Sequence, residues 1–367
     1  MPNRIRNFPQ QYLDAVLKAA RTMLPFHLAV LAYSLAVLGF SWHLGRMDAL
    51  AYGQYIDRFG PVYLIAMPLI MLCGMIVLLI VRTHDWTARR LAVARTLAPD
   101  PVGRFVSGLI ALASFIIFMG SFTTFKNLMP DLMGGFLFDR VQADIDRILH
   151  FGHDPGPVLI QVFDAPFVRR AIEWNYSVLW SLLGFLPIYF IAVSASADRL
   201  RLRYFMTIFA VWSVLGSLLA CLFLSAGPAF YGHVTGDVSR FAPLLAFLAD
   251  TTSGGASAAR FQAYLWDNFI SGTPALGTGI SAFPSVHVGL AMMHALFLRE
   301  LNRTAGLIGF GYVAVVTMSS IYLGWHYAID GYVSIIVVAL LYAVLKRLFR
   351  PSAAREALTP HPTPAKA

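Results

Sequence analysis

Eight long apolar stretches determine what this chain can fold into. Most of them reach the ~20 residues that an α-helix needs to cross about 30 Å of hydrocarbon at about 1.5 Å per residue. They contain almost no charged side chains except Asp330, and they do not alternate as barrel strands do. The sequence therefore predicts an all-α, polytopic integral membrane protein with about eight spans, at residues 24–42, 61–81, 102–122, 176–193, 204–225, 285–298, 305–323 and 327–345.

The composition agrees with this interpretation. Of the 367 residues, 58% are apolar and 13% are charged, whereas an average soluble domain has about 45–50% apolar and about 25% charged residues. So little charge argues against a cytosolic enzyme and excludes a disordered chain. The two cysteines, Cys73 and Cys221, lie in apolar stretches, which leaves no disulfide framework and no cysteine-based metal site.

The Lys and Arg residues indicate the orientation. Most of the 28 basic residues fall in the N-terminal arm, in the connections after the second, fourth and sixth stretches, and in the C-terminal tail. Cytoplasmic loops carry the excess of Lys and Arg, so both termini are predicted to be cytoplasmic. The net charge of +9 then reflects topology, and the expected partner is the bilayer rather than nucleic acid. We expect a bacterial inner (cell) membrane protein.

Four further segments have their own predicted structure. Two long extracytoplasmic connections, at about residues 123–175 and 226–284, are expected to contain short interfacial helices. The N-terminal arm, residues 1–23, is predicted to be a retained interfacial helix, because apolar residues recur near helical spacing among Arg and Lys. The tail, residues 351–367, has four prolines and few large apolar groups and is predicted to be disordered.

Two short segments place ionisable groups at the extracytoplasmic boundary. Such groups are candidates for a functional site, because they are costly to keep in a membrane. His287 stands at the start of the sixth stretch, and residues 319–330 contain His326 and Asp330. The sixth and seventh stretches share a cytoplasmic turn near Asn302, and they rise about 20 and about 27 Å from it at ~1.5 Å per residue. The two histidines are therefore expected to meet just below the outer surface.

These residue types suit phosphoryl transfer. Asp330 follows His326 by four residues, which places both on one helix face if the eighth helix begins near Trp325. A carboxylate at one ring nitrogen raises the basicity of the other, so His326 is a candidate nucleophile and His287 a candidate acid. The helix N-terminus that opens at Ser285 favours phosphate. A metal site of the two histidines and Asp330 is the competing interpretation, although no further ligand cluster joins them.

The same segments resemble the type 2 phosphatidic acid phosphatase superfamily. The sequences Pro-Ser-Val-His at residues 284–287 and Ser-Ser-x5-His-x3-Asp at residues 319–330 are similar to its second and third signature motifs, Pro-Ser-Gly-His and Ser-Arg-x5-His-x3-Asp. Residues 225–231, 279–287 and 323–331 look most like its inositol phosphorylceramide synthase branch. The resemblance covers about residues 126–345. We accordingly expect four parts: the arm at residues 1–23, N-terminal transmembrane helices at 24–125, a catalytic membrane domain at 126–350, and the tail at 351–367.

The resemblance implies a role for each site residue. His326 would attack phosphorus to give a phosphohistidine, Asp330 would orient it, and His287 would protonate the leaving group. Ser285 and Ser319 would hold phosphate oxygens, and neither a metal nor a cofactor would be required.

Three departures from the family pattern concern the phosphate. Val286 replaces the motif glycine, Ser320 replaces the phosphate-binding arginine, and the usual first motif, Lys-x6-Arg-Pro, is absent. Lys126, at the outer end of the third stretch, is the best candidate for the missing cation. The alternative for Lys126 is an ordinary snorkelling lysine.

The resulting functional prediction is a membrane lipid phosphotransferase acting on the extracytoplasmic side. It would transfer a phospho-head group, such as phosphoinositol, from a lipid phosphate to a lipid hydroxyl. With water as the acceptor it would be a phosphatase, acting on phosphatidic acid or an isoprenyl pyrophosphate. A catalytically inactive lipid-binding or transport protein is the third interpretation, favoured by the loss of the motif arginine. The sequence leaves the oligomeric state open.

Overall fold

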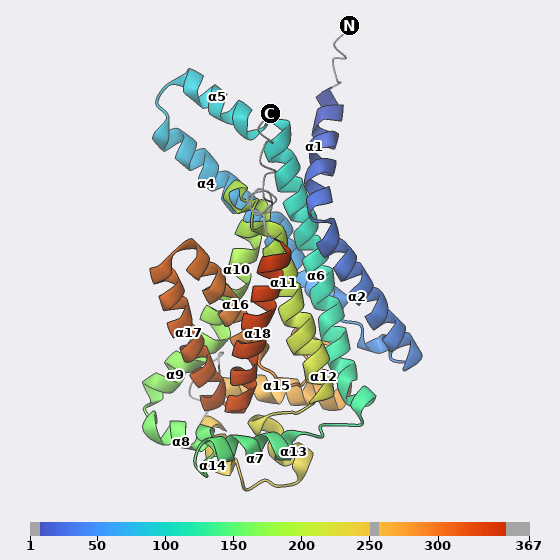
Figure 1. The fold of residues 1–367 in the computed structure, drawn as a ribbon, viewed down its shortest axis with the longest axis vertical. Helices are drawn as coiled ribbons and strands as arrows, with labels where there is room; N and C mark the ends of the chain where they lie inside the picture. The colour runs from blue at the N-terminus through green and yellow to red at the C-terminus, as the bar shows by residue number, and fades with distance from the viewer. Residues whose placement is uncertain (1–7, 250–256, 350–367) are drawn as a thin grey trace, which may run out of the picture.

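The computed structural model describes residues 8–249 and 257–349, and every regular element in these ranges is helical (Figure 1). This confirms the all-α prediction. The predicted disordered tail lies outside the described residues. The α-helices are α1 (Phe8–Thr22), α2 (Leu24–His43), α3 (Tyr52–Pro61), α4 (Met67–Arg82), α5 (Trp86–Thr96), α6 (Pro99–Met133), α7 (Asp139–Leu149), α8 (Pro155–Val162), α9 (Pro166–Trp174), α10 (Trp180–Val193), α11 (Arg201–Ala210), α12 (Ala220–Leu222), α13 (Tyr231–Thr235), α14 (Ala242–Ala249), α15 (Ala258–Ser271), α16 (Val286–Leu301), α17 (Arg303–Tyr322) and α18 (Ala328–Leu348).

Several helices are continued by π-helical segments, and short 3-10 turns connect others. The π-helical segments of the described chain are η2 (Val62–Ala66), η3 (Asn175–Leu179) and η5 (Val211–Leu219). The 3-10 turns are η1 (Met47–Ala49), η4 (Ala195–Ala197) and η6 (Pro228–Phe230). Because η3 joins α9 directly to α10, these three elements form one continuous rod.

Seven helical stretches of the described chain are long and apolar enough to cross a membrane: Leu24–His43, Met47–Arg82, Pro99–Met133, Pro166–Val193, Arg201–Leu222, Arg303–Tyr322 and Ala328–Leu348. The remaining expected span is α16, which has 16 residues and is shorter than the others. It nevertheless packs against both α17 and α18 inside the bundle. The protein is therefore a polytopic helical membrane protein, as predicted.

The third span is much longer than the sequence indicates. Its apolar stretch ends near residue 122, whereas α6 continues to Met133, where Gly134 takes a left-handed conformation with φ of 72° and ends the helix. The first long connection therefore begins at Gly134 rather than at residue 123, and Lys126 lies within a helix. Small residues bring other helices close to α6, since a Cβ at Gly108 would lie 2.5 Å from the carbonyl oxygen of Ala192 in α10.

Helices α16 and α17 form the antiparallel hairpin that the sequence predicts. α16 ends at Leu301, and the side chain of Asn302 caps α17 by accepting a hydrogen bond of 3.0 Å from the backbone N–H of Ala305. The start of α16 and the end of α17 therefore lie at the same end of the bundle (Figure 1). This brings the start of α16 and the end of α17 to a similar level.

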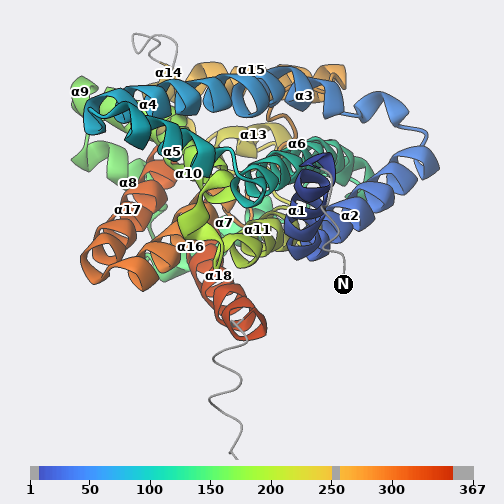
Figure 2. The ribbon, with the colours of Figure 1, turned by 90° about the horizontal axis from the view of Figure 1, so that it is seen from above.

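A layer of short helices covers that end of the bundle, and we call it the cap. It consists of α7, α8, α13, α14 and α15, which come from the two long connections where short helices were predicted (Figure 1). Within it α7 contacts α13 and α18, α8 contacts α14 and α17, and α14 contacts α15. Seen from above, α15 runs alongside α3 (Figure 2). The start of α1 and the end of α18 lie at the opposite end (Figure 1).

The described part of the N-terminal arm, from Phe8 onwards, forms a helix, as expected. α1 packs beside the first part of α6, so closely that a Cβ at Gly103 would lie 2.6 Å from the backbone of Ala15. Its position at the membrane interface stays a prediction.

Candidate active site

His326 and Asp330 form a buried pair at the start of α18. His326 Nδ1 lies 3.1 Å from Asp330 Oδ2, and the two residues are 7% and 0% exposed. Their geometry differs from the prediction, because α18 begins at Ala328 and not near Trp325. His326 therefore precedes the helix, and the two residues do not share a helix face. Asp330 instead reaches back as part of a capping box, in which Oδ2 also accepts a hydrogen bond of 3.0 Å from the N–H of Tyr327.

This pairing sets the state of the His326 ring. Because Nδ1 faces a carboxylate, the neutral ring carries its proton there and keeps Nε2 as the basic nitrogen. Burial, with the nearby charge of Lys126, lowers the pKa of His326 to about 3. The imidazole is therefore neutral at neutral pH, which is the form that attacks an electrophile.

His287 lies close to this pair, as the sequence predicts. The ring centroids of His287 and His326 are 6.4 Å apart. Two aromatic side chains from the α9–α10 rod enclose His287: Tyr176 stacks on it at 4.7 Å with planes 15° apart, and the Trp180 ring lies 3.9 Å away. Trp180 Nε1 also donates a hydrogen bond of 3.1 Å to the backbone carbonyl of His287. These contacts fix the ring from one side.

A cavity of about 400 Å³ adjoins both histidines. Its wall is formed by α3, α6, η3, α10, η5, α15 and the segment between α15 and α16. Aromatic side chains dominate the wall: Tyr55, Phe59, Phe122, Tyr176, Trp180, Phe185, Trp212, Phe230, Phe261, Tyr264 and Trp325. A cavity of this kind suits a largely apolar ligand.

Among the described residues that line this wall, Lys126 is the one lysine, and no Arg, Asp or Glu joins it. It projects from α6, and the backbone of Gly279 packs over its stem, since a Cβ there would lie 2.9 Å from Lys126 Cβ and Cγ. No carboxylate among residues 8–249 and 257–349 forms a salt bridge with it. The side chain therefore faces the cavity as an uncompensated cation rather than reaching to the membrane surface.

The two predicted phosphate-binding serines are engaged within the protein. Ser285 Oγ accepts from the N–H of Val288 at 3.4 Å as the N-cap of α16. Ser319 Oγ donates to the carbonyl of Val315 at 2.7 Å and accepts from Asn175 Nδ2 at 3.4 Å. Both serines are fully buried and neither lines the cavity. Their contact with phosphate stays a prediction and would require each hydroxyl to exchange its partner.

The departures from the signature motifs have visible structural consequences. Val286, in place of the motif glycine, is accommodated by the absence of a side chain at Gly216 in η5, where a Cβ would lie 3.0 Å from Val286 Cγ2 and 2.6 Å from Phe122. Ser320, in place of the arginine, is 1% exposed and donates to the carbonyl of Thr317 at 2.8 Å. Ser320 is therefore turned into its own helix and takes no part in the cavity.

The turn that carries His326 is packed against the segment after α12. Gly227 has φ of 91°, and a Cβ there would lie 2.7 Å from the carbonyl oxygen of Trp325, so only glycine fits this position. The N–H of Ala229 donates to the carbonyl of Gly324 at 2.9 Å, and the N–H of Ala282 donates to Ser225 at 2.8 Å. Three segments distant in sequence are thereby joined beside the histidines.

Asp139, at the start of α7, holds this junction and was not recognised from the sequence. Its carboxylate accepts hydrogen bonds of 2.8 Å from the backbone N–H groups of Ala226 and Gly227 and from the Tyr327 hydroxyl. Burial raises the pKa of Asp139, although these three donors oppose the shift. The contact ties α7 to the residue that follows His326.

Asp146, two turns later on the same face of α7, holds the start of α18. It accepts hydrogen bonds of 2.9 and 3.1 Å from the backbone N–H groups of Ala328 and Ile329. Burial raises the pKa of this carboxyl as well. The spacing of the two aspartates on an amphipathic helix is the one signal in the sequence that could have identified them.

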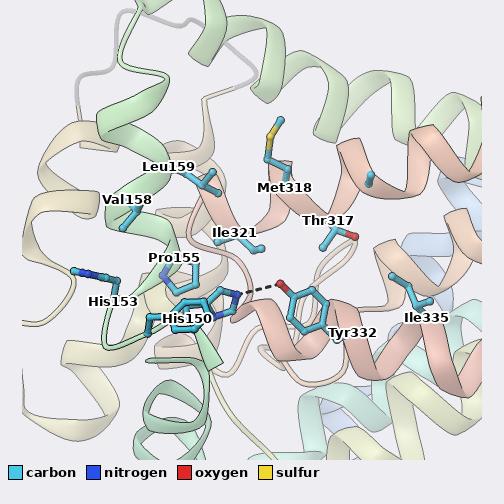
Figure 3. Close-up of a pocket in the computed structure, with 12 residues that line it drawn as sticks. His150, His153, Pro155, Val158, Leu159, Thr317, Met318, Ile321, Tyr332 and Ile335 are labelled. Atoms are coloured by element: carbon cyan, nitrogen blue, oxygen red, sulfur yellow. Dashed lines mark hydrogen bonds between the residues drawn. The ribbon is translucent and has the colours of Figure 1, made fainter. Parts of the chain in front are cut away.

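A second cavity, of about 590 Å³, lies between α8, α17 and α18 (Figure 3). Its wall is mostly apolar, and His150 Nε2 and the hydroxyl of Tyr332 meet there at 3.1 Å. None of the residues that line it also lines the cavity of the histidines. It therefore lies outside the candidate active site.

The described residues include no group of three or more His, Cys, Asp or Glu side chains placed to share a metal ion. The fold and the site define a polytopic helical membrane protein in which a buried His–Asp pair and a second histidine border an aromatic cavity.

Comparison with protein families identifies this class more closely. The sequence model of one family, the PAP2 superfamily, matches residues 143–344, which is more than half of the chain. The protein therefore belongs to that superfamily. It is accordingly a lipid enzyme of the phosphatase or phosphotransferase type. The matched range includes His287, His326 and Asp330, whereas Lys126 precedes it. No curated protein matches the chain. No solved structure matches it either.

Proposed function

We propose that the protein is a lipid phosphotransferase that transfers a phospho-head group, such as phosphoinositol, through a phosphohistidine at His326. The observation that carries this proposal is the buried His326–Asp330 pair, whose imidazole lines the same cavity as His287 and Lys126. A nucleophile, a proton donor and a cation therefore border one space. This is the set of groups that a metal-independent phosphoryl transfer requires.

In the first step Nε2 of His326 attacks the phosphorus of the donor lipid. A P–N bond forms and the P–O bond to the leaving alcohol breaks. His287, which takes up a proton as the anionic phosphate binds beside it, gives that proton to the departing oxygen. Asp330 stabilises the positive charge that develops on the His326 ring. Lys126 neutralises charge on the phosphoryl oxygens, as the missing motif cations would otherwise do.

In the second step an acceptor hydroxyl attacks the phosphohistidine. The new P–O bond forms as the P–N bond breaks, and the hydroxyl proton passes to His287, which restores both histidines. A lipid hydroxyl as acceptor makes the protein a transferase, and water makes it a phosphatase. The aromatic wall supports transfer, because it is suited to a lipid acceptor and limits the access of water.

The resemblance of residues 279–287 and 323–331 to the inositol phosphorylceramide synthase branch supports the phosphoinositol head group. The distribution of Lys and Arg supports an orientation in which the cap and the cavity face outwards from a cell membrane. Hydrolysis of phosphatidic acid or an isoprenyl pyrophosphate at the same site is the alternative function.

The test uses the full chain purified in detergent. Phosphatidylinositol, phosphatidic acid and an isoprenyl pyrophosphate are offered in turn, each with and without ceramide or diacylglycerol. Both the phosphorylated product lipid and the product of hydrolysis are measured; the latter is inositol phosphate for phosphatidylinositol and free phosphate for the other two donors. We expect the product lipid to exceed the product of hydrolysis when an acceptor is present. The His326→Ala variant should lose turnover and the acid-labile phosphoenzyme together.

Other outcomes would separate the alternatives. Free phosphate or inositol phosphate released at equal yield with and without the acceptor lipids identifies a hydrolase. Turnover that is lost reversibly with EDTA supports the metal site. Undiminished turnover in His326→Ala contradicts the covalent mechanism, and a folded wild-type protein that binds these lipids without turning any over is a binding or transport protein.

A further inference from the structure

Tyr176 presents a buried hydroxyl that has no hydrogen-bond partner among residues 8–249 and 257–349. The residue is 5% exposed, and it lines the cavity of the histidines. A buried polar group without a partner is costly to the folded protein. Its ring is nevertheless fixed, because it stacks on His287 with a centroid distance of 4.7 Å. The hydroxyl is thus held next to the reacting groups without a structural role of its own.

The backbone that carries Tyr176 is irregular. Tyr176 belongs to η3, a π-helical turn inserted between α9 and α10. Such turns are rare, and they occur frequently at functional sites because they change the direction in which side chains point. In this protein η3 also places Asn175 against Ser319 and is followed by Trp180 against His287. The irregular turn therefore supplies two contacts around the histidines, from Asn175 and Tyr176, and Trp180 at the start of α10 adds a third.

The hydrogen-bond donors that the signature motifs would present to a phosphoryl group do not line the cavity. Ser285 and Ser319 use their hydroxyls within the protein, and Ser320, at the position of the motif arginine, is turned into α17. Lys126 faces the cavity but supplies a point charge from one direction. A donor on the side of His287 is missing from this set, and the hydroxyl of Tyr176 lies there.

We propose that the Tyr176 hydroxyl donates a hydrogen bond to a non-bridging oxygen of the phosphoryl group bound between His326 and Lys126. It thereby takes over part of the role of the motif arginine that this chain lacks. The inference rests on the proposed function, since it assigns a ligand at the same site. A residue that only packs on His287 would need the ring but not the hydroxyl, and this difference can be measured.

The decisive variant is Tyr176→Phe, which keeps the stacked ring and removes the hydroxyl. The probe is orthovanadate, which adopts the geometry of a phosphoryl group in transfer. A hydrogen bond to an anionic oxygen predicts that the affinity for orthovanadate falls about 10- to 100-fold. The thermal stability of the free protein should stay equal or rise, because an unpartnered hydroxyl has been removed.

The matched control is Tyr312→Phe in α17. Tyr312 also has a hydroxyl without a hydrogen-bond partner in a non-exposed environment, but it does not line the cavity. Its replacement removes the same group and should leave the affinity for orthovanadate unchanged. The double variant Tyr176→Phe/Lys126→Met extends the test. If both residues contact one phosphoryl group, the fold-loss of affinity for orthovanadate in the double variant should differ several-fold from the product of the losses in the two single variants.

Unchanged affinity for orthovanadate in a folded Tyr176→Phe variant would overturn the assignment of the hydroxyl. The proposed function would then survive if the wild type still forms the phosphoenzyme at His326. A stability loss in Tyr176→Phe that accounts for the weaker binding would also overturn it, because the role would then be structural. A wild-type protein that neither binds orthovanadate nor forms a phosphoenzyme would overturn both proposals together.

Discussion

At the scale of single residues, the two histidines differ in their surroundings. His326 faces a carboxylate and is 7% exposed, whereas His287 is enclosed by the rings of Tyr176 and Trp180. An imidazole next to a carboxylate is stabilised when it becomes positive, as it must when Nε2 forms a bond to phosphorus. His287 has aromatic neighbours and a free approach to the cavity, which suits a group that only passes a proton.

This asymmetry gives a prediction for His287→Gln. General acid–base assistance typically contributes about 10²- to 10⁴-fold, so turnover of a lipid donor should fall by that amount while the phosphoenzyme still forms. With p-nitrophenyl phosphate the loss should shrink, because that leaving group departs without a proton. Burst and steady-state kinetics measure both effects.

The control for this variant is His294→Gln, seven residues further along α16. His294 is bonded to the hydroxyl of Tyr204 at 2.8 Å and does not line the cavity. In His294→Gln, turnover should depend on the leaving group in the same way as in the wild type. A phosphoenzyme that persists in His326→Ala and disappears in His287→Gln would reverse the two roles.

At the scale of elements, α7 acts as a brace across the cap. Its two buried aspartates bind backbone around the turn that carries His326: Asp139 binds Ala226 and Gly227, which pack against that turn, and Asp146 binds the first turn of α18. The carboxylate of Asp146 also lies at the positive end of the α18 dipole. The position of the His326–Asp330 pair therefore depends on a helix that contributes nothing to the cavity wall.

We predict that Asp146→Asn lowers kcat about tenfold and leaves KM nearly unchanged, because Asn has one acceptor oxygen for two N–H donors. An unsatisfied buried donor should also reduce the free energy of unfolding by about 1–3 kcal/mol. Kinetics and thermal unfolding of the same preparation test the two effects. Asp144→Asn, on the exposed side of α7 where Asp144 pairs with Arg240, is the matched control and should change neither. Equal behaviour of the two variants would contradict the role of α7.

Much of the fold follows from local sequence, but the site depends on contacts between distant segments. Hydrophobic stretches predict most of the spans, and the turn at Asn302 brings His287 and His326 together as expected. The start of α18 was misplaced because the capping box of Asp330, and not helical periodicity, sets it. Tyr176 was missed for a similar reason, since hydropathy gives no sign of a π-helical turn or of the partner on which a ring will stack.

At the scale of the whole molecule, the bundle has two unlike ends. The cap covers one end, next to the histidines, and the start of α1, α5 and the end of α18 lie at the other (Figure 1). The basic residues of the connections are concentrated at that second end. Since a positive excess marks the cytoplasmic side, the cap should face outwards and receive its lipids from the outer leaflet.

Labelling of single cysteines in intact cells tests this orientation. In a variant with Cys73 and Cys221 replaced by Ala, a new cysteine is placed either between the cap helices α13 and α14, as Val238→Cys, or in α5, as Arg95→Cys. Both positions are exposed. A membrane-impermeant maleimide should label Val238→Cys in intact cells and Arg95→Cys only after the membrane is permeabilised. Labelling after permeabilisation is the control that both thiols are reactive. The reverse pattern would place the cap in the cytoplasm, and the donor and acceptor lipids would then have to come from the inner leaflet.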